Sequence, residues 1–158
     1  MSIIISIVPI VLGALAATSA ATTATASMIE TDVNKQKSNQ DVIELATNIR
    51  NEKLLRETLV KMGAQNIQID QKSLGSDIDD FHIVFVQKDN GTFNIQFIGN
   101  INQEEAINFK NDLIAEYSNM VQNYVYETLK TKAEEKGLTL EKEILQSDQS
   151  IVLTYNIN

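Results

Sequence analysis

Hydrophobic residues are distributed unevenly along this chain. From Met1 to Ile29 no side chain is charged, and every Lys, Arg, Asp and Glu lies after that segment. Ile and Val dominate its first half, whereas Ala and Thr dominate its second half. A helix needs about 20 apolar residues to cross a bilayer, and residues 3–26 meet that length. The pattern therefore predicts a hydrophobic N-terminal helix over residues 1–29, with membrane contact through residues 3–26.

The chain becomes polar after this segment and then alternates between element types. Residues 30–40 lack an apolar period and are interpreted as a tether to a domain over residues 41–158. The apolar positions from Val42 to Ile49 suit a first strand or an early helical turn. Asn51 is a suitable N-cap for the helically spaced leucines that follow it, and Gly63 stands at the usual position of a C′ glycine. A short amphipathic helix is predicted between them.

Strand patterns fill the middle of the domain. Ile67 and Ile69 alternate with polar neighbours, and residues 81–86 are a run of strand formers. The Asp-Asn-Gly sequence at 89–91 has the composition of a tight hairpin turn, and the residues after it alternate strictly as far as Ile98. A β-hairpin is therefore predicted over residues 81–98.

A long helix and a closing hairpin complete the domain. Asn102 and Glu105 have the spacing of a capping box, and the helix that they open extends to Lys136, before Gly137. Residues 138–155 have the pattern of two strands with a turn between them. The order of elements predicts an α+β domain, with a short and a long helix packed on one face of a mainly antiparallel sheet and preceded by the N-terminal hydrophobic helix.

Composition narrows the possible functions. The chain has 158 residues, which suffices for one ordinary domain, and its net charge is −8. An acidic protein repels phosphate backbones, so nucleic acid is not an expected partner. Cysteine is absent, which excludes disulfides, thiolate metal sites and a cysteine nucleophile.

Three interpretations of the N-terminal segment remain open. In the first, it is a retained membrane anchor, and Lys35, Lys37 and Arg50 after it place the domain on the cytoplasmic side under the positive-inside rule. In the second, residues 24–26 form the cleavage site of an export signal, and the domain is exported. In the third, the segment is a helix buried in a protein assembly.

The C-terminal stretch resembles a known family in several short motifs. These are Tyr117, the sequence Val-Gln-Asn-Tyr-Val at 121–125, the acidic run and glycine at 133–138, and the Asp-Gln-Ser-Ile-Val-Leu sequence at 148–153. Residues 47–63 also resemble the opening helix of that family. The family is the uncharacterised one founded on the thirty-fifth hypothetical chloroplast reading frame, which also occurs in cyanobacteria and other bacteria.

The resemblance covers about residues 47–157 and supports the α+β fold. Gln149 stands at the position of the family's turn glycine, and the tryptophan of the family's middle region is absent. The family has no established activity, so the resemblance implies no catalytic, cofactor or metal residue.

One acidic cluster is a candidate for metal chemistry. Asp77, Asp79 and Asp80 lie close together in a segment with a loop-like composition, and carboxylates are ligands for Ca²⁺ and Mg²⁺. The twelve-residue calcium-loop pattern is missing, because His82 stands where that loop has its glycine. A solvated loop cluster is the favoured interpretation, and no metal, catalytic or cofactor residue is assigned.

The remaining candidates have structural interpretations. His82 is the sole histidine, so a multi-histidine metal site is excluded. On a strand it faces away from Phe81 and Ile83, toward the polar side. Tyr117 and Tyr124 belong to the apolar stripe of the long helix and are predicted in the core.

Two classes of function follow. In the first, a non-enzymatic module, membrane-anchored or assembly-forming, scaffolds or recruits a protein partner or a second copy through a free sheet face or edge. In the second, a small enzyme or ligand-binding domain uses the acidic cluster with a divalent ion, and metal then raises the thermal midpoint unless Asp79 is changed to Asn. The absence of a nucleophile with a base partner, and of a cofactor motif, favours the first class.

Overall fold

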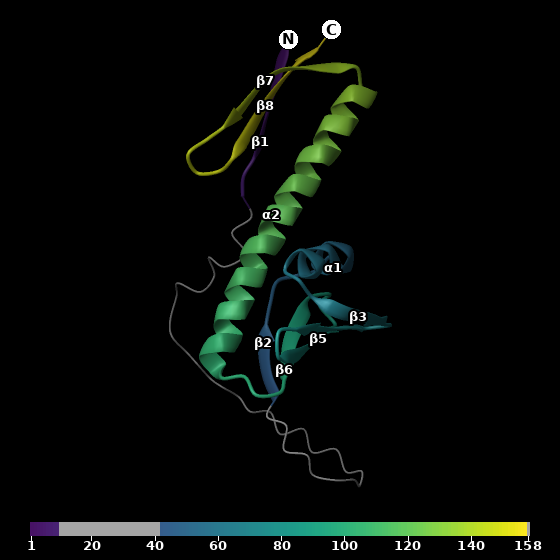
Figure 1. The fold of residues 1–158 in the computed structure, drawn as a ribbon. Helices are drawn as coiled ribbons and strands as arrows, with labels where there is room; N and C mark the ends of the chain where they lie inside the picture. Colours follow the sequence, from purple (N-terminus) through teal and green to yellow (C-terminus); the bar gives the residue numbers. More distant parts are fainter. Residues whose placement is uncertain (10–41, 158) are drawn as a thin grey trace.

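The computed structural model describes residues 1–9 and 42–157, which form two antiparallel sheets connected by one long helix (Figure 1). One sheet has five strands in the order β2-β6-β5-β4-β3, and the other has three in the order β1-β8-β7. The predicted α+β class, with antiparallel strands, a short helix and a long helix, is confirmed. The expected single sheet is wrong, because the strands divide between two sheets.

The five-stranded sheet contains most of the middle of the chain. Its strands are β2 (Val42–Ala46), β3 (Gln65–Asp70), β4 (Ser73–Ile78), β5 (Phe81–Gln87) and β6 (Phe93–Ile98). Helix α1 (Glu52–Lys61) and the first half of α2 (Gln103–Glu135) pack on the same face of it. We call these strands, α1 and residues 103–121 of α2 the five-stranded unit.

The core of the five-stranded unit follows from strand alternation. Ile83 and Phe85 on β5, and Ile95 and Phe97 on β6, point to the helices and have no exposed surface. Leu55 of α1 and other apolar residues of both helices pack against these four side chains. Within this core three aromatic rings, Phe81, Phe97 and Phe109, pack at centroid distances of 5.7 to 6.0 Å.

Both helices begin and end at the residues that the sequence indicates. The side chain of Asn51 accepts a hydrogen bond from Leu54 N, and Asn102 forms a full capping box with Glu105. Gly63 and Gly137 follow the two helices with φ values of 88° and 70°, which an L side chain rarely adopts. These local signals were sufficient to predict the helices.

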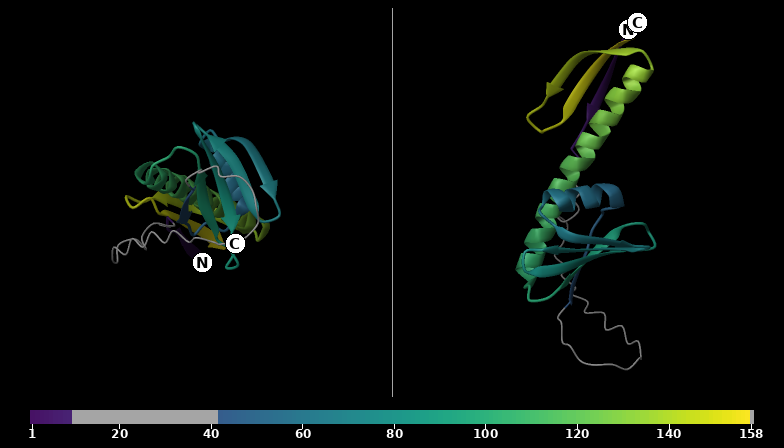
Figure 2. Two further views of the ribbon diagram at one scale, coloured as in Figure 1. Left: turned by 90° about the horizontal axis from the view of Figure 1, so that it is seen from below. Right: turned by 45° about the vertical axis from the view of Figure 1, so that its right-hand side comes forward.

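Helix α2 has 33 residues and is about 50 Å long, so it reaches from one sheet to the other. Its buried positions step mostly by four, and each such step advances around the helix by about 40° beyond a full turn. Between Leu113 and Leu129 the buried side therefore rotates by about 160°. The two sheets accordingly lie on opposite sides of α2 (Figures 1 and 2).

The three-stranded sheet joins the two ends of the described chain. Its strands are β1 (Ser2–Ile7), β7 (Leu138–Leu145) and β8 (Ile151–Ile157), with β8 in the centre. Ser2 pairs with Asn156, and Ile7 with Ile151. With residues 125–135 of α2 these strands form what we call the three-stranded unit, whose buried hydrophobic residues are Ile7, Ala133, Leu153 and Tyr155.

The N-terminal segment requires a correction. Ser2–Ile7 is a strand paired with β8, so the predicted N-terminal helix is wrong at these residues. Isoleucine is β-branched and favours strands, and pairing with β8 satisfies backbone groups that a helix would have bonded internally. In residues 1–9 and 42–157, no helix has the length and apolarity needed to cross a bilayer. These findings overturn the membrane anchor over residues 3–26 and the cytoplasm-facing orientation derived from it.

Several sequence predictions fall outside the described part of the chain. They are the remainder of the N-terminal segment after residue 9, the possible cleavage site at 24–26 and the tether over residues 30–40.

Candidate functional site

The outer face of the five-stranded sheet is the candidate site. Strand alternation sends every second side chain of β2, β4, β5 and β6 away from both helices, and no described element packs against them. The registers arrange these residues in three rows across the sheet. The rows are Asp77-His82-Ile98-Val42, Gly75-Val84-Gln96-Glu44 and Ser73-Val86-Asn94-Ala46.

Four apolar side chains, Val42, Val84, Val86 and Ile98, lie on these rows, and we call them the outer band. Val84 lies at its centre, with Val86 and Ile98 beside it on the neighbouring rows. All three are half-buried, and Val42 at the edge is 54% exposed. Apolar residues so placed lose water contact only when another surface covers them.

A cluster of polar side chains around the carboxylate of Glu44 lies at one side of the outer band, and we call it and its counterpart around Asp77 the carboxylate clusters. Asn94 Nδ2 donates to Glu44 Oε1 at 2.7 Å, and Gln96 Nε2 donates to Glu44 Oε2 at 3.1 Å. Lys88 Nζ lies 2.9 Å from Glu44 Oε1. The hydrogen bond from Asn94, followed by that from Lys88, lowers the pKa of Glu44 from 4.5 to about 2. Glu44 therefore keeps its negative charge at a lower pH than an ordinary Glu side chain does.

A second cluster lies at the other side. His82 Nδ1 is 2.6 Å from Asp77 Oδ1, and Asn66 Nδ2 donates to Asp77 Oδ2 at 2.8 Å. The hydrogen bond from His82, followed by that from Asn66, lowers the pKa of Asp77. Because the carboxylate is an acceptor, Nδ1 of His82 is the donor. The His82 ring lies over Gly75, where a Cβ atom would meet its Cε1 and Nε2 atoms at 3.6 Å.

The structure separates the acidic cluster that the sequence places together. Asp77 belongs to β4, so its loop assignment is wrong, and its carboxylate is engaged by His82 and Asn66. Asp79 and Asp80 lie in the turn between β4 and β5, with Asp79 at a φ of 50°. Within the described ranges no group of three Asp, Glu, His or Cys side chains is placed to hold a metal ion.

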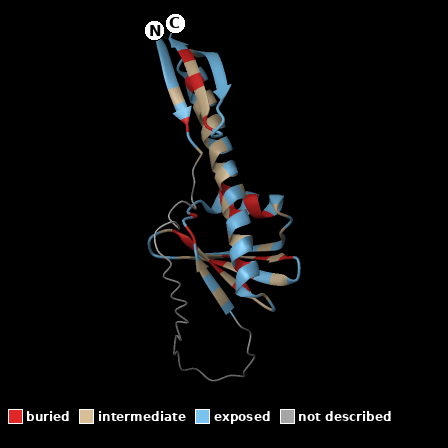
Figure 3. Ribbon diagram, turned by 90° about the vertical axis from the view of Figure 1, so that its left-hand side faces the viewer, coloured by how far each residue is buried: buried red, intermediate tan, exposed pale blue. Residues whose placement is uncertain are grey.

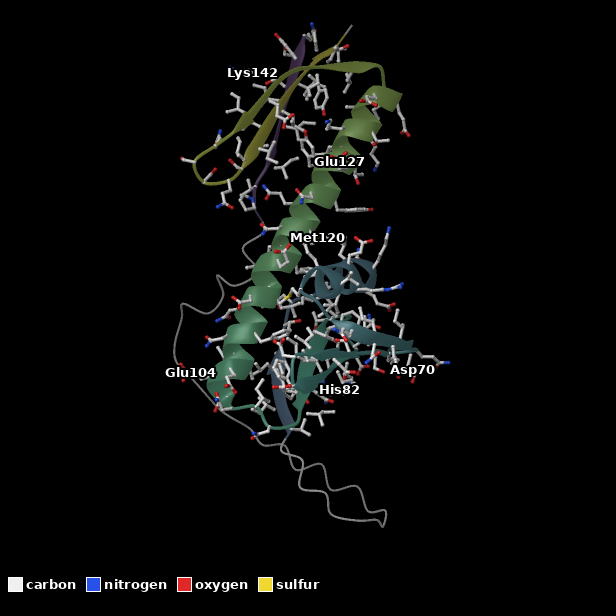
Figure 4. The ribbon with its side chains drawn as sticks, in the orientation of Figure 1. Asp70, His82, Glu104, Met120, Glu127 and Lys142 are labelled. Carbon is white, nitrogen blue, oxygen red and sulfur yellow. The ribbon has the colours of Figure 1, made fainter. Side chains whose placement is uncertain are left out.

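The other predicted residues have mixed outcomes. His82 is exposed on the outer face, away from Phe81 and Ile83 as alternation predicts, although that face also carries the outer band. Figure 4 shows it on the lower sheet, far from Lys142 of the three-stranded unit. Tyr117 is buried, and its hydroxyl accepts a hydrogen bond from Asn51 N at 3.1 Å. Tyr124 is 54% exposed, so its core assignment is wrong. It lies between the part of α2 that serves one core and the part that serves the other.

Sequence reasoning missed Glu44, Asn94 and Gln96 as a group. They come from strands about 50 positions apart, and no local motif links them. The available signal was alternation, because all three precede or follow inward-facing apolar residues by one position.

We compared the chain with known proteins. No protein-family model, no curated protein and no solved structure matches this chain. The resemblance to the chloroplast reading-frame family over residues 47–157 therefore stays a prediction.

Proposed function

We propose that the protein is a non-enzymatic module that recruits a protein partner through the outer face of its five-stranded sheet. The observation that carries this proposal is the outer band, an apolar strip on a sheet face that no described helix covers. Protein interfaces typically combine a desolvated apolar centre with a polar rim. The band and its two flanking carboxylate clusters have that arrangement.

The charge of the unit indicates the chemistry of the partner. Between Val42 and Met120 there are twelve acidic and seven basic side chains. Glu44 and Asp77 are ionised at neutral pH, and their lowered pKa values extend that ionisation into more acidic solution. A partner with a basic contact surface is favoured, since complementary potentials raise the association rate and disfavour acidic competitors.

The two clusters also lower the ordering cost of binding. Glu44 holds two amide side chains and one ammonium group in place, and Asp77 holds His82 and Asn66. Side chains that are fixed before association lose less conformational entropy when a partner arrives. The face is therefore suited to binding without rearrangement.

Site-specific photo-crosslinking in cells tests the proposal. A photoreactive amino acid at Val42, in the outer band, is compared with one at Val60, on the exposed side of α1. The two valines are matched in exposure, at 54% and 58%. We expect a discrete heavier adduct from position 42 and none from position 60, with one protein of basic surface identified in it by mass spectrometry.

A variant in the band provides the specificity control. Val84→Asp places a charge at the centre of the band without touching the core, so the fold persists while the adduct disappears. The interaction is then measured with purified components by calorimetry at low and high salt, and high salt is expected to weaken it. Equal adducts at both positions, or an adduct unaffected by Val84→Asp, would refute recruitment through this face.

A further inference from the structure

Four strands lie at sheet edges in the described part of the chain, and three of them carry features that discourage pairing with another chain. β3 has a bulge between Gln65 and Gln68, and β2 carries the charged Glu44. β7 has both a bulge and a run of charges at 141–143. Bulges and charges are the devices by which natural sheets protect their edges. β1 has neither, since its sequence Ser-Ile-Ile-Ile-Ser-Ile is regular, uncharged and free of proline.

The hydrogen bonds of β1 show which of its backbone groups are open. Ile157 N donates to Met1 O at 2.9 Å, so Met1 faces β8. In an antiparallel pair, alternate residues bond to the same neighbour. Ile3, Ile5 and Ile7 therefore also bond to β8, and Ser2, Ile4 and Ser6 direct their N–H and C=O groups to the open edge.

We propose that a second copy of this chain occupies that edge, with the two β1 strands antiparallel and Ile4 on the two-fold axis. Ile4 of one copy then pairs with Ile4 of the other, and Ser2 pairs with Ser6. Each of these pairs exchanges two backbone hydrogen bonds in an antiparallel ladder. In this register every outward N–H and C=O group of Ser2, Ile4 and Ser6 is hydrogen-bonded. The face of the sheet that packs on α2 in one copy continues into the same face of the other copy.

The side chains and charges favour self-pairing. Ile4 is 70% exposed and Ile3 39%, so apolar surface flanks the open edge on both faces of the sheet. In the proposed register Ile3 meets Ile5 of the other copy, and no charged side chain of β1 meets its equivalent. A closed two-fold interface is also the commonest form of oligomer.

Electrostatic repulsion between the acidic five-stranded units of the two copies does not oppose this arrangement. Most of the negative charge belongs to the five-stranded unit, which lies at the far end of α2. That distance is several times the screening length of about 8 Å at physiological salt. The three-stranded unit, with the N-terminal residues, has six acidic and four basic side chains and is nearly balanced. The dimer therefore forms one six-stranded sheet, with the two acidic units apart.

A single introduced cysteine tests the register in the full chain, which has none of its own. In the proposed pair the two Ile4 Cα atoms are about 5.5 Å apart, within disulfide range. We expect Ile4→Cys to give a covalent dimer under mild oxidation on a non-reducing gel. Ile144→Cys, a control of 39% exposure on the opposite edge strand, is expected to stay monomeric. Equal cross-linking of the two variants would overturn the register.

The dimer itself is tested by sedimentation. We expect the unmodified chain to show twice the monomer mass at micromolar concentration, and Ile4→Pro to show the monomer mass with an unchanged circular dichroism spectrum. Proline is tolerated on an edge where the N–H faces outward, but it removes the central donor. Ile4→Lys, which sets two like charges opposite each other, provides an independent disruption. A monomeric unmodified chain, or dimers in both variants, would refute the proposal, and neither outcome affects recruitment through the outer band.

Discussion

The five-stranded and three-stranded units differ most in the size of their cores. The first buries fourteen hydrophobic residues, including three phenylalanines, whereas the second buries four. Figure 3 shows the difference as buried segments around the lower sheet and mostly exposed strands above. A small core contributes little free energy of folding by itself. The three-stranded unit therefore depends on its packing against α2, and the larger core of the five-stranded unit holds α2 in place.

The largest expected effect comes from the larger core. Phe85 has no exposed surface and lies in the centre of the five-stranded sheet. Phe85→Ala is expected to lower the free energy of unfolding by about 3–5 kcal/mol. Because α2 loses its support, amide hydrogen exchange should accelerate in both units. If the amides of the three-stranded unit keep their protection from exchange in this variant, that unit does not depend on the five-stranded unit through α2.

The next effect is expected from the smaller core, and it is confined to one unit. Leu153 is fully buried in β8, and Leu153→Ala is expected to cost about 2–5 kcal/mol within its own unit. Exchange should accelerate in β7 and β8 while the amides of β5 and β6 keep their protection. Native-state exchange measured by NMR checks this asymmetry, and equal acceleration in both units would contradict it.

A gain of stability is expected at Tyr155. Its side chain is 1% exposed, and its hydroxyl has no hydrogen-bond partner among the described residues. An unpaired buried hydroxyl is costly, so Tyr155→Phe should raise the stability of the three-stranded unit by about 1 kcal/mol. Chemical denaturation followed at a probe in β7 measures the change. A loss of stability would show that the hydroxyl has a partner.

The two units should also differ in their response to acid, through Glu44. Its pKa falls from 4.5 to about 2 on folding, so its stabilising contribution is present above pH 4.5 and disappears as the pH falls toward 2. Glu44→Gln is expected to cost up to about 1 kcal/mol at pH 7 and progressively less as the pH falls through 2, where folded Glu44 takes up its proton. Denaturation curves of the five-stranded unit at several pH values test this, with Glu57→Gln on α1 as the exposed control. A difference independent of pH would contradict it.

The smallest expected effect is a gain at the turn between β7 and β8. Gln149 has a φ of 65°, a conformation that glycine adopts without the steric penalty of a side chain. Gln149→Gly is therefore expected to stabilise the three-stranded unit by up to about 1 kcal/mol. Thermal unfolding measures this gain, and Asn123→Gly on α2, which should destabilise, is the contrasting control.

The sequence was most informative where structure is local. The caps at Asn51 and Asn102 and the hairpin around Gly91 could be predicted, because each rests on neighbouring residues. β4 was missed because its sequence contains a glycine, two serines and an aspartate, which are poor strand formers. Leu74, Ser76 and Ile78 alternate with outward-facing residues and are all buried. Because the middle one is a serine, this alternation can be recognised only once the strand pairing is known.

The remaining errors concern long-range partners. A short apolar run such as that of β1 suits a strand or a buried helix equally well, and its partner β8 lies near the other end of the chain. The apolar positions of α2 suit a single stripe when taken from the sequence, whereas the buried side rotates from one core to the other, and this rotation is what accommodates the second sheet. The carboxylate clusters of the outer face likewise depend on pairings between distant strands.

The pairing of β1 with β8 has a consequence for synthesis. A ribosome makes β1 before any other described strand and makes β8 after roughly 150 further residues, which takes about 7–30 s. During that interval β1 lacks its partner strand, whereas all the residues of the five-stranded unit are made before β8. Among the described strands, β1 therefore waits longest for its partner, and it is uncharged and rich in isoleucine. We expect chaperones to bind nascent chains most often at Ser2–Ile7.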